Sequence, residues 1–242
     1  METAASKPAI VKESDFVELE YSAKIADTGD LFDTTSAQIA KQHGLYDEHT
    51  TYEPVIVSVG KRHVVSGLDK HLVGKEVGKD YTVRIPPEEG FGRKNAKLIQ
   101  LISTAKFKQQ NLVPHPGMQV NIDGIVGLVK TVTGGRTVVD FNHPLSGREI
   151  EYNFSVKRII ADLSEKVKAV LKLLGISTNA IKVSAADSAA TIEFPEQVPD
   201  ELKKDLEEKL KSTIADLKSV SFTVKATLAA KESSKDHTAA PQ

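Results

Sequence analysis

The side chains that could take part in chemistry here are mostly apolar and aromatic, and many of them lie in one stretch, residues 64–92. A short helix is predicted after Ser66, because Leu68 and Leu72 lie one turn apart. Phe91 stands between two glycines at a predicted loop tip, where glycine takes positive φ without steric cost. Apolar side chains close to such a turn predict a small dry pocket. An aromatic residue placed in this way also serves as plain core packing, and the stretch alone leaves both uses open.

Other kinds of chemistry find little support in the sequence. There is no cysteine, which excludes disulfides and thiol catalysis. His43, Asp47, Glu48 and His49 could be drawn as metal ligands, but their spacing matches no recognised site and is typical of a solvated loop. We find no Ser-His-Asp set and no phosphate-binding loop. We therefore expect no metal and no other cofactor.

Composition limits the partners and the location. The chain has 242 residues, which predicts two or three domains. Its net charge is -1 and its lysines are spread among glutamates, so we expect no nucleic-acid partner. The first ten residues lack the apolar run of a signal peptide, and no segment is long and apolar enough to span a bilayer. The sequence thus predicts a cytoplasmic protein with no membrane partner.

The order of short motifs along the chain resembles the FKBP family of peptidyl-prolyl cis-trans isomerases. The motifs are VELEY at 17–21, GDLFDTT at 29–35, GLD at 67–69, LVGK at 72–75, Gly78 and PPEEGFG at 86–92. Two later motifs, NHPLSG at 142–147 and EYNF at 151–154, are similar to the SlyD-like branch, which carries an inserted domain in one loop. The resemblance covers residues 11–160, and the remainder looks like the extension of long archaeal-type members.

The resemblance implies an α+β fold, in which an FKBP-like antiparallel β-sheet wraps on a short helix. It also implies an inserted, small β-rich domain in the flap. The order of predicted elements after residue 162 adds a C-terminal α+β domain. The expected parts are a flexible tail at 1–12, a discontinuous isomerase domain at 13–93 and 142–160, a chaperone-like β insert at 94–141, a C-terminal domain at 161–230 and a flexible tail at 231–242.

Local patterns predict several elements independently of the resemblance. Residues 16–25 alternate apolar and polar, as in a half-buried strand. Asp123-Gly124 predicts a hairpin between strands at 118–122 and 125–132, with a third strand at 137–141. After residue 162 the expected order is helix, strand, strand, helix, strand: an apolar helical face ends at Gly175, a second helix opens at Pro199-Asp200, and the last strand runs from Val220 to Leu228.

The activity implied by the resemblance needs neither a nucleophile nor a metal. Rotation about an Xaa-Pro bond breaks no covalent bond, and its barrier of about 18–20 kcal/mol comes from amide resonance. Transferred residue by residue, the resemblance predicts a catalytic pocket formed by Tyr21, Phe32, Asp33, Val64, Val65, Leu68, Phe91 and Tyr152. It adds substrate contacts at Val55, His143 and Leu145.

The predicted insert has about fifty residues, near the lower limit for burying its own apolar surface. An ordinary small core would bury most of the apolar side chains of the insert. Those left exposed would form an apolar surface that binds unfolded chains. We expect both to hold in part. The side chains predicted to contact substrate are Leu98, Ile99, Leu101, Phe107, Met118, Ile122 and Ile125.

Three positions depart from the family pattern. Leu68 stands where many members have Trp, Phe91 replaces a more common Tyr and so removes a hydroxyl, and Tyr152 replaces the usual Phe. These departures leave open a second interpretation, a catalytically weak or inactive holdase chaperone that retains the fold. Asp33 also has two compatible uses, bordering the pocket or capping a helix that begins near Ser36.

The expected partners are unfolded or partly folded polypeptides that contain proline. The apolar helices of the C-terminal domain fit either a self-contained core or the interface of a homodimer, and the helix pattern does not separate the two.

Overall fold

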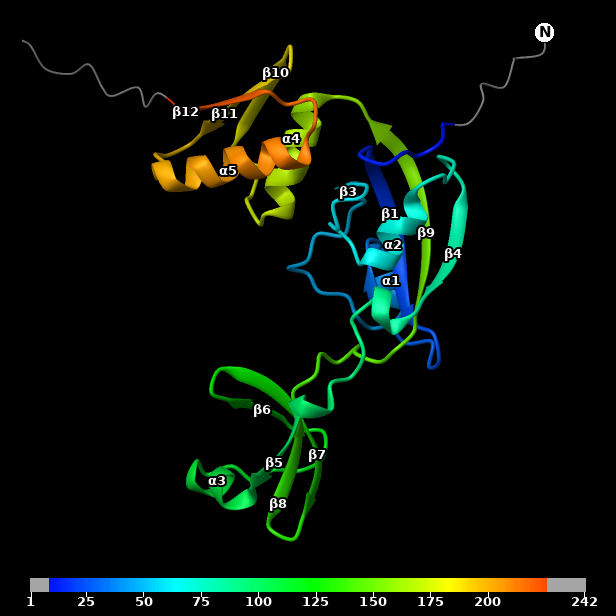
Figure 1. Cartoon of the computed structure of the whole chain (residues 1–242), viewed down its shortest axis with the longest axis vertical. Coiled ribbons are helices and arrows are strands. Elements are labelled where there is room, and N and C mark those ends of the chain that lie inside the picture. The colour runs from blue at the N-terminus through cyan, green and yellow to red at the C-terminus, as the bar shows by residue number, and fades with distance from the viewer. Residues whose placement is uncertain (1–8, 226–242) are drawn as a thin grey trace, which may run out of the picture. The chain divides into compact units, whose positions relative to one another are not determined.

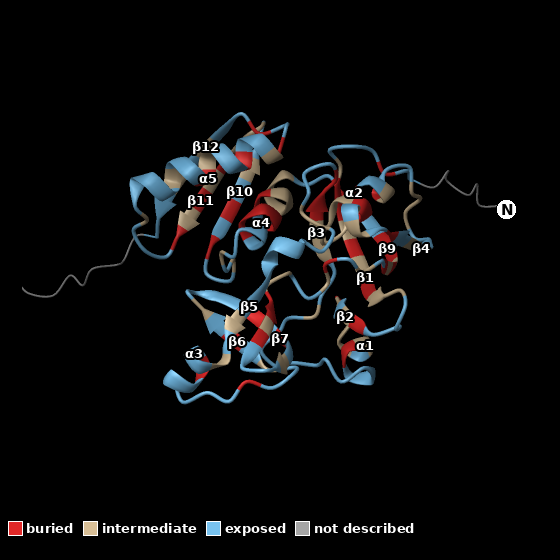
Figure 2. Ribbon diagram, turned by 60° about the horizontal axis from the view of Figure 1, so that its bottom comes forward, coloured by how far each residue is buried: buried red, intermediate tan, exposed pale blue. Residues whose placement is uncertain are grey.

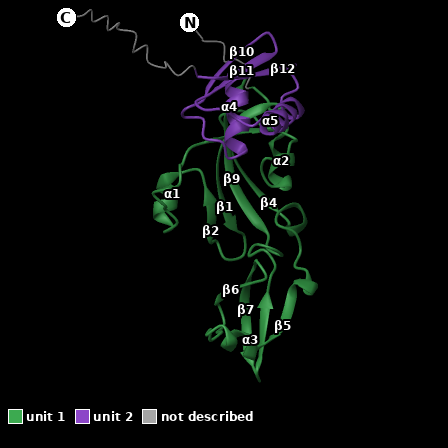
Figure 3. Ribbon diagram, turned by 90° about the vertical axis from the view of Figure 1, so that its left-hand side faces the viewer, with its two compact units in different colours: residues 1–161 green, residues 162–242 purple. Residues whose placement is uncertain are grey.

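We describe residues 9–225 from a computed structural model of the chain. The chain divides into two compact units, residues 1–161 and residues 162–242 (Figure 3). Within the described residues, no helix is long and apolar enough to cross a membrane.

The first unit is built on a five-stranded antiparallel sheet. Its strands are β1 (Phe16–Ile25), β2 (Leu31–Thr34), β3 (Val55–Ser58), β4 (Asp80–Ile85) and β9 (Ile150–Ile160). The order is β2-β1-β9-β4, and β3 also pairs with β1. β1 and β9 run side by side over their whole length, from the pair Phe16 and Ile160 to the pair Ile25 and Ile150 (Figure 1). The sheet is the antiparallel one expected, and β1 has the predicted bounds.

Helix α2 (Ser66–Leu72) supplies the apolar side chains that pack on this sheet. Leu68 and Leu72 are fully buried, in one cluster with Ile85 of β4 and Ile150 of β9. Figure 2 shows buried residues along β1 and β9 of the same sheet. Gly67 allows the close approach, because a Cβ atom at this position would lie 2.4 Å from the Cγ2 atom of Ile85. The Ser66 hydroxyl donates a hydrogen bond to the Glu89 carbonyl at 2.9 Å, which ties the start of α2 to the segment after β4.

The expectation of a flexible tail over residues 1–12 is wrong for its described end. Val11 is 1% exposed and belongs to the core of the first unit. Its N–H donates to the Lys75 carbonyl at 2.9 Å, and its carbonyl accepts from the Gly74 N–H at 2.8 Å. The sequence did not indicate this role, because Ile10 and Val11 are two neighbouring apolar residues among small and charged ones and give no periodicity. Residues 1–8 and the predicted tail at 231–242 lie outside the described residues.

The segment predicted as an insert contains a second antiparallel sheet, in the order β5-β8-β7-β6. Its elements are β5 (Ile99–Ser103), α3 (Thr104–Gln109), β6 (Gln119–Ile122), β7 (Ile125–Thr133) and β8 (Arg136–Asp140). Asp123 and Gly124 form the predicted hairpin turn, both at positive φ. A small core of four buried residues lies beneath the sheet: Phe107, Val120, Val129 and Val139.

The second unit has the predicted order of elements. They are α4 (Leu163–Leu173), β10 (Lys182–Ala186), β11 (Ala189–Phe194), α5 (Asp200–Thr213) and β12 (Ser219–Val224). The Asp162 carboxylate caps α4 by accepting the Glu165 N–H at 2.7 Å. β11 pairs antiparallel with β10 and parallel with β12, with α5 in the connection to β12. Leu228, in the predicted last strand, lies outside the described residues.

Replacing Gly67 with alanine should destabilise the first unit, although alanine is the better helix former. The new methyl group would overlap Ile85, and overpacking of this kind costs about 1–3 kcal/mol. All five tyrosines lie in residues 1–161 and the chain has no tryptophan, so urea unfolding followed by tyrosine fluorescence reports on this unit.

The helix propensity alone predicts the opposite sign, a gain of about 0.5–1 kcal/mol for Gly67→Ala. A more stable variant would therefore show that α2 does not approach β4 this closely. Gln38→Ala, at an exposed site of α1 (Ala37–Gln42), is the control for a change made in a helix without a close contact.

Candidate functional site

Four aromatic rings form a cluster over the sheet of the first unit. Tyr21 comes from β1, Phe32 from β2, Tyr152 from β9 and Phe91 from the loop after β4. Ring centroids lie 5.7 Å apart for Tyr21 and Tyr152, 6.5 Å for Phe32 and Tyr152, and 6.0 Å for Phe32 and Phe91. The two pairs that include Phe32 are edge-to-face, the geometry that aromatic pairs favour. Phe32 and Tyr152 are therefore the two inner rings of the cluster, each in contact with two others.

Aliphatic side chains complete the surroundings of the rings. Leu68 of α2 is fully buried in the core, whereas Val55, Val64 and Val65 are half-buried and pack against the same core. The aromatic residues Tyr21, Phe32 and Phe91 are also half-buried. The structure thus brings together the apolar residues predicted for the catalytic pocket, and several of them keep an exposed part that a ligand could contact. Their roles in catalysis remain a prediction.

Asp33 borders the cluster and caps no helix. The Tyr21 hydroxyl donates a hydrogen bond to Asp33 Oδ2 at 2.8 Å. The suggested capping role of Asp33 is wrong, because the Ser36 side chain accepts the Ile39 N–H at the start of α1. Burial raises the pKa of the Tyr21 phenol, and the negative charge of Asp33 raises this pKa further. Both effects also raise the pKa of Tyr152, so the two phenols stay protonated at neutral pH.

The loop that carries Phe91 is held from both sides. The Gly92 N–H donates to the Pro87 carbonyl at 2.7 Å, and the Ser146 hydroxyl donates to the Phe91 carbonyl at 3.1 Å. The exposed imidazole of His143 stacks on the Phe91 ring at 4.7 Å with parallel planes. His143 Nδ1 also accepts the N–H of half-buried Leu145 at 3.2 Å. Both predicted contact residues therefore belong to the segment that supports Phe91.

Asp69 is a residue whose role the sequence did not indicate. It is 4% exposed, and its two carboxylate oxygens accept the N–H groups of Gly60 and Arg62, each at 2.9 Å. These bonds fix the loop that leads from β3 to Val64 and Val65. In the sequence, Asp69 looks like an ordinary acidic residue in the first turn of a helix, so only the folded loop reveals the contact.

The predicted contact residues of the insert divide into exposed and buried ones. Leu98, Ile99, Leu101 and Ile125 are exposed, by 40%, 42%, 57% and 59%. Met118 and Ile122 are half-buried against the core of the insert. The prediction is wrong for Phe107, which is 3% exposed because it is the main side chain of α3 in that core.

Two exposed apolar residues of β7 in the insert, Val126 and Leu128, were missed. Val126 is 59% exposed and follows Ile125 in β7, although successive side chains of a strand point to opposite faces. Both faces of this part of the sheet therefore expose apolar side chains.

The comparisons with known proteins agree with this geometry. The model of the family described as FKBP-type peptidyl-prolyl cis-trans isomerase matches residues 7–110. A second model, described as FKBP26, IF domain, matches residues 100–145. The short-type peptidyl-prolyl cis-trans isomerase of Methanocaldococcus jannaschii is 32% identical over 150 residues, which cover 62% of this chain and 94% of that protein.

The chain therefore belongs to the family of FKBP-type peptidyl-prolyl cis-trans isomerases, as the motifs predicted. Its relatives include the SlyD protein of Haemophilus influenzae, 33% identical over 126 residues, which cover 50% of this chain and 66% of the relative. The 16 kDa isomerase of Escherichia coli K12 is 29% identical over 134 residues, which cover 53% and 84% of the two chains. These matches confirm the family and enzyme class, and they support the resemblance to the SlyD-like branch.

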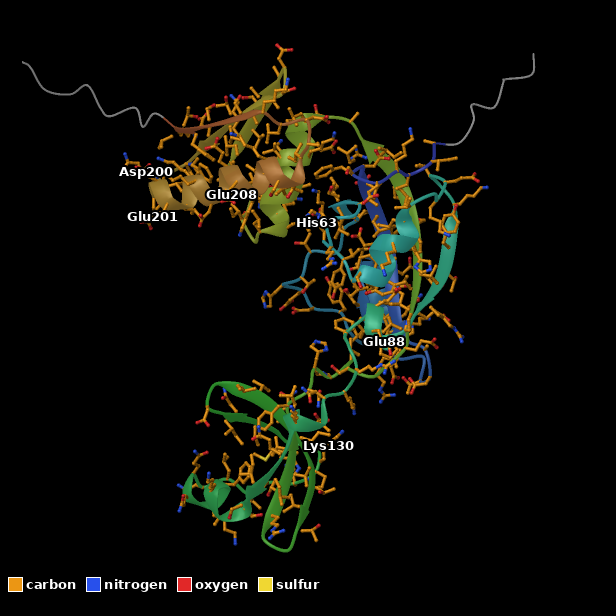
Figure 4. All side chains as sticks on the ribbon, viewed as in Figure 1. His63, Glu88, Lys130, Asp200, Glu201 and Glu208 are labelled. Atoms are coloured by element: carbon orange, nitrogen blue, oxygen red, sulfur yellow. The ribbon has the colours of Figure 1, made fainter. Side chains whose placement is uncertain are left out.

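His63, in the loop beside the cluster, makes a hydrogen bond that depends on the protonation state of its ring. Figure 4 labels this residue between β3 and α2. Its Nδ1 atom accepts the Ser58 N–H at 3.1 Å, which requires a ring without a proton on that nitrogen. Burial lowers the pKa of His63 below its ordinary value of 6.5, and Lys61 lowers it further, against an opposing effect of Asp69.

We expect the stability of the first unit to fall as the pH decreases below about 6.5. The unfolded chain protonates His63 at a higher pH than the folded chain does, so acid favours unfolding between the two pKa values. In urea unfolding followed by tyrosine fluorescence, the wild type should lose more stability between pH 7.5 and pH 5 than His63→Gln. Parallel pH curves for the two proteins would contradict this assignment.

Proposed function

We propose that the chain is a peptidyl-prolyl cis-trans isomerase and folding chaperone, with the aromatic cluster as the catalytic site. The observation that supports this proposal is the convergence of Tyr21, Phe32, Phe91 and Tyr152, from four separate segments, next to the buried floor residue Leu68. The substrates are the Xaa-Pro bonds of unfolded or partly folded polypeptides.

The mechanism follows from the chemistry of the amide bond. The planar amide is stabilised by a charge-separated resonance form, which water solvates well and an apolar site solvates poorly. The twisted amide has lost this resonance, so an apolar site favours it relative to the planar ground state. The rings of Phe32 and Phe91 would hold the pyrrolidine ring of proline, while the rest of the peptide stays near the polar edge at Asp33.

The insert at 94–141 would act as a separate client-binding domain. Its exposed apolar residues, among them Leu101 and Ile125, could bind unfolded segments and raise the local concentration of prolines near the catalytic site. Because the Asn95 N–H donates to Asn142 Oδ1 at 2.8 Å, the two connections to the insert lie next to each other. Because its two connections are adjacent, the insert can be deleted and replaced by a short linker.

The catalytic assignment predicts that Phe32→Ala lowers kcat/KM for a short Xaa-Pro peptide about 10- to 100-fold, because one of the two inner rings of the cluster is lost. Proton NMR exchange spectroscopy on the peptide measures this rate directly. Phe222→Ala, which removes half of the aromatic pair with Phe194 in the second unit, is the control and should leave the rate unchanged. Equal rates for the wild type and Phe32→Ala would contradict the assignment.

The client-binding assignment predicts a selective loss when residues 95–141 are replaced by a short glycine-rich linker. The variant should isomerise a short peptide at the wild-type rate and lose most of its advantage on a refolding protein limited by proline isomerisation. Leu101→Ser should reproduce part of this loss, whereas Leu202→Ser, an exposed leucine of the second unit, should not. An unchanged rate on the refolding protein after deletion would contradict the coupling.

A holdase without catalysis is the second candidate, and the exposed apolar residues of the insert favour it. Such a protein would suppress the aggregation of a denatured client and leave the peptide isomerisation rate at background. The short-peptide assay on the wild type separates the two functions. The homodimer through residues 161–230, the cytoplasmic location and the limits of the insert stay predictions.

A further inference from the structure

The hydroxyl group of Tyr152 has no hydrogen-bond partner among residues 9–225, although the side chain is 4% exposed. Within the described residues, Ser58 Oγ is the buried side-chain polar atom that lacks a partner. The Tyr152 hydroxyl is therefore not fully enclosed, and it belongs to the small part of this side chain that solvent reaches. A tyrosine hydroxyl that solvent reaches and that no described protein group engages is open to an acceptor on a ligand.

The other phenol of the cluster is engaged. The Tyr21 hydroxyl donates its proton to Asp33 Oδ2, so it is not available as a donor to a ligand without breaking that bond. The nearby Phe32 and Phe91 rings carry no polar atom. Tyr152 is thus the side chain of the aromatic cluster that offers a free O–H group, on a ring that contacts both Tyr21 and Phe32.

The environment keeps this group a donor. Burial and the negative charge of Asp33 raise the pKa of Tyr152, so the phenol holds its proton throughout the working range of an enzyme. The ring is fixed by packing in the core cluster, because Tyr152 lies on the central strand β9 between β1 and β4. A fixed donor binds an acceptor with a smaller loss of entropy than a mobile one does.

We propose that the Tyr152 hydroxyl is a substrate-binding group that donates a hydrogen bond to a backbone carbonyl oxygen of the peptide whose proline lies against the aromatic cluster. This inference rests on the proposed isomerase function and adds a residue to it. The carbonyl is one that does not take part in the rotation, since a donor to the rotating amide oxygen would stabilise the planar form and slow the reaction. The bond is consequently equal in the ground state and the transition state, and it serves binding.

The test is Tyr152→Phe, which removes one oxygen atom and keeps the ring. A neutral hydrogen bond contributes about 0.5–1.5 kcal/mol, so KM for a short Xaa-Pro peptide should rise about two- to tenfold while kcat stays within about twofold. The dissociation constant of the same peptide, from an NMR titration, should rise by the same factor. Tyr81→Phe is the matched control: its hydroxyl, on β4, accepts the Glu76 N–H, and its loss should leave KM and the dissociation constant unchanged.

Three results would overturn the inference. An unchanged KM and dissociation constant in Tyr152→Phe would show that the hydroxyl does not contact the peptide. A fall in kcat at constant KM would show that it acts on the rotating amide. A rise in KM shared by Tyr81→Phe would indicate a general effect of losing a phenol. If the wild type binds the peptide without accelerating its isomerisation, the proposed function fails, and the titration still tests the hydroxyl.

Discussion

The close approach of α2 to the sheet is the constraint on which the site depends. Gly67 leaves no room for a Cβ atom above Ile85, so the helix lies against β4 at a fixed depth. The next two residues of the helix then make different contacts. Leu68 packs in the core next to the aromatic cluster, and Asp69 accepts hydrogen bonds from the loop that leads to Val64 and Val65. One helical turn thus positions both Leu68 and the loop that carries Val64 and Val65 in the candidate site.

Much of this arrangement could be predicted from the sequence. Period-two alternation predicted β1, and the Asp123-Gly124 dipeptide predicted the hairpin of β6 and β7. The two glycines beside Phe91 predicted that this residue lies at the tip of a loop. These features are local, so short-range patterns are sufficient to find them. The motif order added the long-range part, since the resemblance placed Tyr21 and Tyr152 in one predicted pocket. The pairing of β1 with β9, which brings the two rings together, is seen only in the structure.

The features that escaped prediction depend on distances between remote atoms. Val11 is core because of backbone bonds to Lys75 and Gly74, and Phe107 is core because α3 folds over its own small sheet. Asp33 was given a capping role that Ser36 takes, because both residues have the right chemistry and only geometry decides between them. The state of the two phenols, one bonded to Asp33 and one unbonded, is also invisible in a list of residue types.

The pairing of β1 with β9 has a consequence for the synthesis of the chain on the ribosome. Ile25 cannot pair until Ile150 has been synthesised. At a translation rate of about 5–20 residues per second, the time between the synthesis of the two residues is roughly 6–25 s. The four strands β5 to β8 follow one another in the chain, so their sheet can close during that delay. The insert of the nascent protein would therefore be folded before β9, the strand between β1 and β4, is available to complete the sheet of the first unit.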